Sequence, residues 1–160
     1  MENRQKSSAA SILLQVAAGL MVLHFVGHTI GMLQSPSHGA EEAAVIQSMK
    51  SHEFNVMGSM RSYWDFFVGF GYDASLNMIL QAVLLWFLAG LARRDAPAAR
   101  PFIAILAGGW VAAFVLYLKY FFLAPTIFAV LMAVVLILAW VSSRASIQMH
   151  KSERVGVHTE

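Results

Sequence analysis

The segment 101–141 constrains the fold most strongly, because it contains no Asp, Glu or Arg and a single Lys, Lys119. A helix needs roughly 20 residues to cross the hydrocarbon core of a membrane, so this segment is too long for one crossing. We therefore expect a hairpin near Lys119–Pro125. Only helices and closed barrels satisfy every backbone group in lipid, and the segment lacks the alternation of a strand. Two membrane-spanning helices are predicted.

Two more apolar stretches precede this segment, which makes four predicted spans: about 9–33, 63–91, 101–118 and 125–141. The fold class is therefore an all-α integral membrane protein, a four-helix bundle in a single membrane domain over residues 1–160, with a polar tail over 145–160. The composition agrees, since 58% of the residues are apolar and 12% are charged, whereas about a quarter are charged in soluble domains. The absence of cysteine excludes disulfides, iron–sulfur clusters and thiolate zinc sites.

The distribution of Lys and Arg predicts the orientation. Eight of the 11 lie before the first span, between the second and third, or after the fourth, and the other three are Lys50, Arg61 and Lys119. Cytoplasmic loops carry the excess of basic residues, so both termini are expected in the cytoplasm. The first span is expected to stay as an uncleaved anchor, because its apolar run is longer than that of a secretory signal.

The residues between the first two spans, 34–62, are predicted to form an amphipathic outer loop. A helix is expected over Ala40–Ser51, with Glu41 and Glu42 in the first turn, where the helix dipole favours anions. Its apolar positions are typical of a helix at the membrane interface: Val45, Ile46 and Met49. We interpret the loop as a cap over the mouth of the bundle, either a protective cover for helix ends or a functional lid.

Ionisable residues inside a span are functional candidates by default, and all of them fall on the first two spans. His24 and His28 are four residues apart, so they share one helix face. On the second span Asp73, Asn77 and Gln81 form a polar stripe with the same spacing. At about 1.5 Å per residue, His24 and Asp73 reach a similar depth. The sequence therefore predicts a polar layer between the two spans.

The outer end of the second span carries the polar residues that would gate this layer: Arg61, Tyr63 and Asp65. For Asp65 and Arg61 we favour the structural alternative, an ion pair at the start of a helix, where a carboxylate also meets the helix dipole. Together with the layer, these residues are predicted to line a pocket that opens outward.

Several chemistries fit the layer. His24 and His28 suit a divalent metal if a third ligand comes from Asp73, or alternatively from Asp65 or His52. The two histidines cannot take opposite axial positions on one haem, although one of them can be a single haem ligand. As a pocket, the layer would hydrogen-bond a quinone- or lipid-like molecule, which is the interpretation we favour. It would also suit acid–base catalysis by a membrane enzyme.

A purely structural role is the alternative, in which the polar groups bond across helices in a homo-oligomer or in an assembly subunit of a membrane complex. The expected partners are the lipid bilayer and a lipophilic small molecule. No motif specifies any other partner. Nucleic acid is not expected as a partner, because no basic cluster lies on a soluble element.

The segments Leu23–Met32 (LHFVGHTIGM) and Met60–Tyr72 (MRSYWDFFVGFGY) resemble motifs of a group of small four-helix bacterial membrane proteins that have no assigned activity. This resemblance covers most of the chain and implies the four-helix architecture and a bacterial inner (cytoplasmic) membrane. Gly58–Tyr72 is also similar to the membrane anchor subunits of succinate dehydrogenase, in which an Arg and an Asp near a helix start accompany haem and quinone sites. Ser62 here follows Arg61 where those subunits have a histidine.

Overall fold

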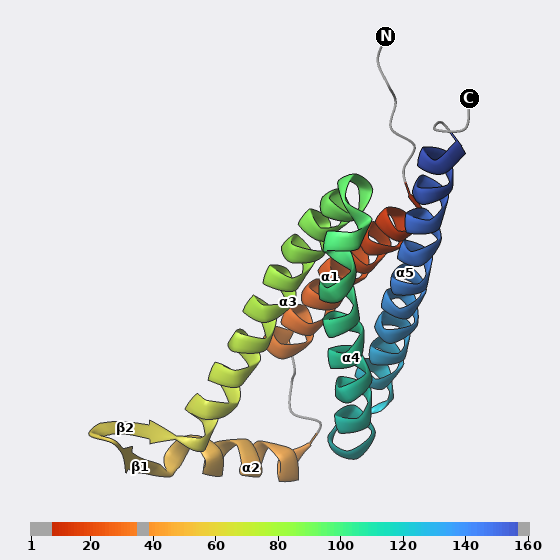
Figure 1. Cartoon of the computed structure of the whole chain (residues 1–160). Helices are drawn as coiled ribbons and strands as arrows, with labels where there is room; N and C mark the ends of the chain where they lie inside the picture. The colour runs from red at the N-terminus through yellow and green to blue at the C-terminus, as the bar shows by residue number, and fades with distance from the viewer. Residues whose placement is uncertain (1–7, 35–38, 157–160) are drawn as a thin grey trace. The chain divides into compact units, whose positions relative to one another are not determined.

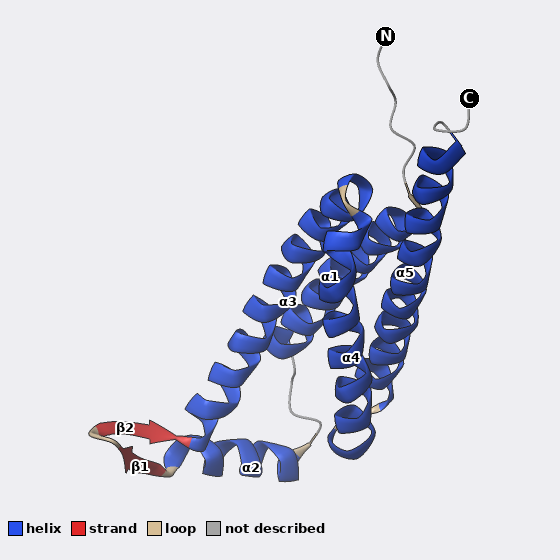
Figure 2. Ribbon diagram, viewed as in Figure 1, coloured by secondary structure: helices blue, strands red, loops and turns tan. Residues whose placement is uncertain are grey.

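The computed structural model describes residues 8–34 and 39–156, with side chains described as far as Arg144 (Figure 1). These residues are mostly helical (Figure 2). In chain order the elements are α1 (Ala9–Gln34), α2 (Ala40–Ser51), β1 (Glu53–Val56), β2 (Ser59–Ser62), α3 (Tyr63–Arg94), α4 (Ala96–Tyr120) and α5 (Leu123–Gly156). The predicted helical class is confirmed, and the antiparallel pair β1–β2 is an addition to it. The side chains of the predicted polar tail lie outside the described residues.

Four helices are long and apolar enough to cross a membrane: α1, α3, α4 and α5 as far as Arg144. They correspond to the four predicted spans and indicate an integral membrane protein. The third begins earlier than predicted, at Ala96 and not at Pro101. The reason is Asp95, whose side chain accepts a hydrogen bond from the Ala98 amide at 3.0 Å and caps the helix. Pro97 lies in the first turn, where a missing amide hydrogen costs little.

The chain divides into two compact units. We call them the bundle unit, which comprises the residues up to Met21 and those from Gln81 onward, and the cap unit, which comprises Val22–Leu80. Helices α1 and α3 each contribute residues to both units. Of the predicted site residues, Gln81 belongs to the bundle unit and the others belong to the cap unit.

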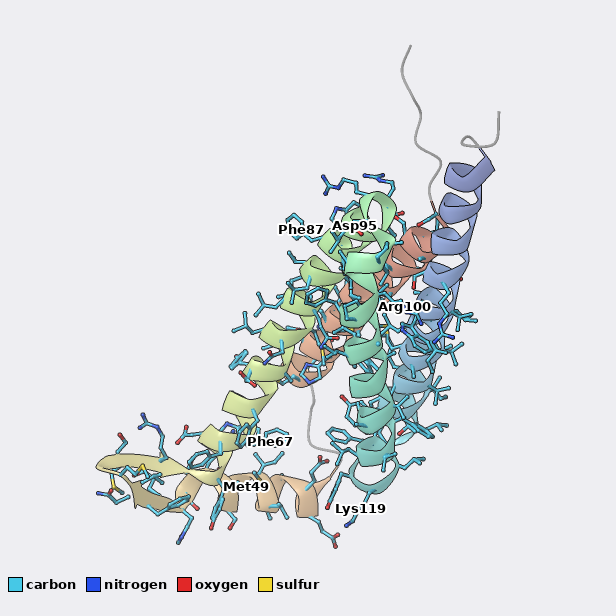
Figure 3. All side chains as sticks on the ribbon, in the orientation of Figure 1. Met49, Phe67, Phe87, Asp95, Arg100 and Lys119 are labelled. Carbon is cyan, nitrogen blue, oxygen red and sulfur yellow. The ribbon has the colours of Figure 1, made fainter. Side chains whose placement is uncertain are left out.

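Small side chains form the interior of the bundle unit. Helices α4 and α5 are joined by Phe121–Phe122 and pack side by side as an antiparallel pair (Figure 1). Small residues let membrane helices approach closely, and alanine is frequent among the buried apolar positions: Ala10, Leu14, Ala17, Ala18, Met21, Ala82, Leu85, Leu88, Ala89, Ala92, Ala99, Ile103, Ala107, Trp110, Ala129, Met132, Ala133, Leu136 and Ala139. Large apolar side chains such as Phe87 point outward (Figure 3), as contact with lipid requires.

Hydrogen bonds of polar side chains connect the helices of the bundle unit. The hydroxyl of Ser11 on α1 donates to the carbonyl of Ala89 on α3 at 2.9 Å. The indole Nε1 of Trp110 on α4 donates to Gln81 Oε1 on α3 at 3.0 Å. Gln81, which the sequence places at the end of a polar stripe, therefore connects two helices through Trp110.

In the cap unit, α2 has the range that the sequence predicts, Ala40–Ser51. Glu41 and Glu42 lie in its first turn and Lys50 in its last, which complements the helix dipole at both ends. Of the predicted apolar positions Ile46 and Met49 are half-buried, whereas Val45 is exposed. No residue of α2 is fully buried, so its packing within the cap unit is limited.

The hairpin β1–β2 follows α2, and sequence analysis did not predict it. Val56 pairs with Ser59, so Met57 and Gly58 form a two-residue turn. Their φ values of 50° and 87° are those of a type I′ turn, which suits the twist of a hairpin. The side chain of Asn55 stabilises the turn, because its Oδ1 accepts a hydrogen bond from the Gly58 amide at 2.8 Å.

Candidate functional site

The two membrane-span histidines lie together on α1. The ring centroids of His24 and His28 are 6.4 Å apart and the ring planes are perpendicular. Their spacing of four residues places them on one helix face, as the sequence predicts. Both side chains are half-buried in a helix apolar enough to cross a membrane, and the Nδ1 atom of His24 is shielded from solvent. The pair is therefore a polar feature in apolar surroundings.

Ser75 on α3 connects the histidine pair to a second helix. Its hydroxyl lies 3.1 Å from His28 Nδ1, and Thr29 Oγ1 donates to the same hydroxyl at 3.0 Å. Ser75 is buried. A hydroxyl can donate or accept, so either tautomer of His28 is satisfied at Nδ1 and Nε2 can serve as an acceptor or a donor. We call His24, His28, Thr29 and Ser75 the histidine cluster.

The close approach of α1 and α3 in the cap unit occurs at Gly71, one turn before Ser75. A Cβ atom at Gly71 would overlap the Sδ atom of Met32 on α1. A Cβ at Gly27 or Gly31 would meet open space, although their spacing on α1 favours close packing against a neighbouring helix. The two small residues through which α3 approaches α1 are therefore Gly71 and Ser75.

Asp73 occupies a different face of α3 from Ser75. Two residues along a helix are separated by roughly 200° around its axis, and Asp73 is exposed whereas Ser75 is buried. Asn77 Nδ2 donates to Asp73 Oδ2 at 3.1 Å and to the Asp73 carbonyl at 2.9 Å. The predicted layer is thus divided in the structure, since His28 bonds to Ser75 while Asp73 pairs with Asn77.

Over the described ranges 8–34 and 39–144, no group of three or more His, Asp or Glu side chains is placed to hold a metal ion. The histidine pair offers two imidazole rings, and the hydroxyl of Ser75 beside His28 accepts a hydrogen bond from the Thr29 hydroxyl.

The three residues that the sequence predicts to gate the layer lie on β2, in the case of Arg61, and in the first turn of α3, in the case of Tyr63 and Asp65. Asp65 Oδ2 accepts hydrogen bonds from the Ser62 amide at 2.7 Å and from the Ser62 hydroxyl at 2.9 Å. The Ser62 hydroxyl accepts in turn from the Asp65 amide at 3.2 Å. This reciprocal pattern is a capping box, with Asp in the place of the usual Glu. Arg61 Nη1 donates to the Met60 carbonyl at 2.6 Å.

Aromatic rings join the hairpin to the start of α3. The ring of Tyr63 lies 4.8 Å from that of Phe54 on β1 and 6.1 Å from that of His52, and Phe54 also stacks at 6.2 Å on Phe66. The ammonium of Lys50 lies 4.5 Å above the Trp64 ring. Tyr63 therefore holds the hairpin against α3, a role that the sequence did not indicate.

Ser75 is not among the site residues that the sequence predicts, because charged side chains and histidines are the stronger candidates inside a span. The available signal was the spacing of Gly71 and Ser75, which matches the small-residue pattern of membrane-helix contacts.

The fold and the cluster define a small polytopic helical membrane protein with an imidazole pair in its cap unit. No protein-family model matches the chain, and neither curated proteins nor solved structures give a match.

Proposed function

We propose that the histidine cluster binds the polar head of a lipophilic small molecule, of quinone or lipid type, in a four-span protein of the bacterial inner membrane. Both termini would lie in the cytoplasm. The observation that carries the proposal is the imidazole of His28, which Ser75 holds at Nδ1 inside a helix apolar enough to cross a membrane.

The chemistry of the cluster suits a ligand with a carbonyl or hydroxyl oxygen. With Nδ1 engaged by Ser75, the His28 ring presents Nε2 to such an oxygen as a donor or as an acceptor. A hydrogen bond is stronger in apolar surroundings than in water, so one well-oriented imidazole contributes measurably to affinity. The apolar body of the ligand would lie along the apolar side chains of the spans, as in other small-molecule sites.

Binding of a short-chain benzoquinone to the detergent-solubilised protein tests this proposal, with tryptophan fluorescence as the signal. We expect His28→Ala to weaken binding by about tenfold, the size of one good hydrogen bond. Ser75→Ala should weaken it less, because Ser75 acts by orienting the ring. Ser11→Ala is the matched control, since Ser11 is also a buried serine that bonds across helices but lies in the bundle unit. It should leave binding unchanged.

The same preparation distinguishes the other chemistries. Lipid mass spectrometry should detect a co-purified quinone or lipid that His28→Ala removes. A haem absorption band, or stoichiometric metal lost in His24→Ala, would replace the proposal with cofactor binding. Equal benzoquinone affinity of the wild type, His28→Ala and Ser11→Ala would also overturn it, and would favour a structural subunit.

A further inference from the structure

Two arginines from different helices lie against one tryptophan in the bundle unit. The guanidinium carbon of Arg100 on α4 is 4.6 Å from the ring centroid of Trp140 on α5, and that of Arg144 on α5 is 4.7 Å from the same centroid. The Arg100 side chain extends from α4 toward α5 (Figure 3). The indole is half-buried, as is Arg100, while Arg144 is exposed. The three side chains form a compact group that we call the arginine pair site.

The position of this site matches the level of lipid headgroups. Arg100 lies in the second turn of α4, and Arg144 is the last residue of the apolar part of α5. Because α4 and α5 form an antiparallel hairpin closed at Phe121–Phe122, both residues lie at its open end. Tryptophan and arginine are both favoured at the membrane interface.

Acidic side chains are scarce in the described part of the bundle unit, which contains this site. Asp95 is the one acidic residue among the described side chains of the bundle unit, 8–21 and 81–144. Its carboxylate caps α4 by accepting from the Ala98 amide. Two guanidinium groups gathered on one ring repel each other, while the face of the ring attracts each of them. An anion that contacts both groups would relieve this repulsion.

We propose that Arg100, Arg144 and the Trp140 indole bind the phosphate group of an anionic phospholipid. Guanidinium groups bind phosphate oxygens through two parallel hydrogen bonds, which a lysine cannot reproduce. Basic pockets between membrane helices recognise headgroups in this way. The apolar outer surfaces of α4 and α5 continue from the site and accommodate the acyl chains, with exposed Ile105 and Ile137 among their side chains. This site is independent of the histidine cluster.

Native mass spectrometry of the full chain in detergent tests the proposal, with phosphatidylglycerol and phosphatidylcholine as probes. Phosphatidylglycerol should bind at least about tenfold more tightly, and Arg100→Ala or Arg144→Ala should each remove about tenfold, because hydrogen bonds to charged groups are the strong ones. Arg100→Lys and Arg144→Lys should lose most of the same affinity while keeping the charge. Arg94→Ala removes an equal charge at the same end and should cost less than about fivefold.

Three results would overturn the proposal. Equal binding of the two lipids would exclude recognition of the anionic headgroup. Equal losses in Arg94→Ala and Arg144→Ala, with the Arg→Lys variants unchanged, would show diffuse attraction to positive charge. Displacement of phosphatidylglycerol by an equal concentration of inorganic phosphate would assign the site to free phosphate. Helical circular dichroism of each variant shows that the chain is still folded.

Discussion

Met57 has the least favourable backbone conformation that the structure shows outside glycine. Its φ of 50° makes it the one non-glycine residue with a positive φ in the described part of the chain, and its side chain is fully exposed at the tip of the hairpin. A left-handed conformation costs an L-residue roughly 1–2 kcal/mol. Asn and Gly bear this conformation most easily, and the next position in the turn is already Gly58.

Met57→Asn should therefore strengthen the hairpin by creating an Asn-Gly turn. If about 1 kcal/mol of strain is relieved, amide hydrogen exchange in β1 and β2 should slow by about fivefold. Met60→Asn is the matched control, because Met60 is an exposed methionine on β2 that does not lie in the turn. Equal effects of the two substitutions would show that side-chain polarity, and not backbone strain, changes the amide exchange rate.

At the residue scale, the sequence predicts the histidine pair but not its partner on α3. The spacing of His24 and His28 was enough to place them on one face of α1. Depth along the helix then selected Asp73 as their partner, although Ser75 lies only about 3 Å further along the same helix. The two side chains point in different directions, and only the rotation of α3 about its axis decides which one meets His28. That rotation depends on packing at Gly71 and Met32, for which the spacing of Gly71 and Ser75 is the available sequence signal.

At the scale of the element, the start of α3 is determined by Ser62 and Asp65. Two of their three mutual hydrogen bonds satisfy amide groups that the start of a helix leaves unpaired, and the third joins the Ser62 hydroxyl to the Asp65 carboxylate. The same turn carries Tyr63, whose ring packs on Phe54 of the hairpin. A well-defined helix start therefore also positions the hairpin.

Asp65→Ala should destabilise the first turn of α3 by about 1 kcal/mol, the usual cost of losing a cap. Faster amide exchange from Ser62 through Phe66 is the expected signature, together with a small decrease in the thermal midpoint in detergent. Arg61→Ala provides the comparison, because it removes the partner that an ion pair would need and leaves the capping box intact. An equal loss in Arg61→Ala would show that Asp65 acts through an ion pair.

The sequence predicts the helices but not the hairpin, and the reason is physical. Ala40–Ser51 carries its own signals in acidic first-turn residues and periodic apolar positions, and the structure has the same bounds. Strands β1 and β2 have four residues each, too few for a reliable alternation. The turn between them places methionine where Asn or Gly is expected. The remaining signal, Asn55 three residues before Gly58, is weak alone because many loops contain such a pair.

At the scale of the whole molecule, the arrangement of side chains is the reverse of that in a soluble protein. Alanines occupy many buried positions, while large apolar residues such as Phe87, Ile105 and Leu118 are exposed. Helices in lipid gain little from burying large apolar side chains, so small residues that permit close packing occupy the contacts. The four spans were predictable because membrane thickness sets their length, whereas the identity of the contact faces required the structure.

The proposed orientation can be measured directly because the chain has no cysteine, so a single introduced thiol is the only one to react. The excess of basic residues between α3 and α4 predicts that this connection lies in the cytoplasm. Met57→Cys at the hairpin tip should then react with a membrane-impermeant maleimide in intact cells. Ala98→Cys, at an exposed position near the start of α4, should react only after permeabilisation.

Membrane depth alone cannot produce this difference, since both positions lie near the ends of spans and are exposed. Labelling of both proteins after permeabilisation shows that each thiol is accessible and that each variant is inserted. The reversed pattern, with Ala98→Cys labelled in intact cells, would place Arg93 and Arg94 outside the cytoplasm and contradict the orientation. It would also move the arginine pair site to the outer leaflet, because Arg100 lies two residues from Ala98 on the same helix. The lipid that this site meets therefore depends on the orientation of the whole chain.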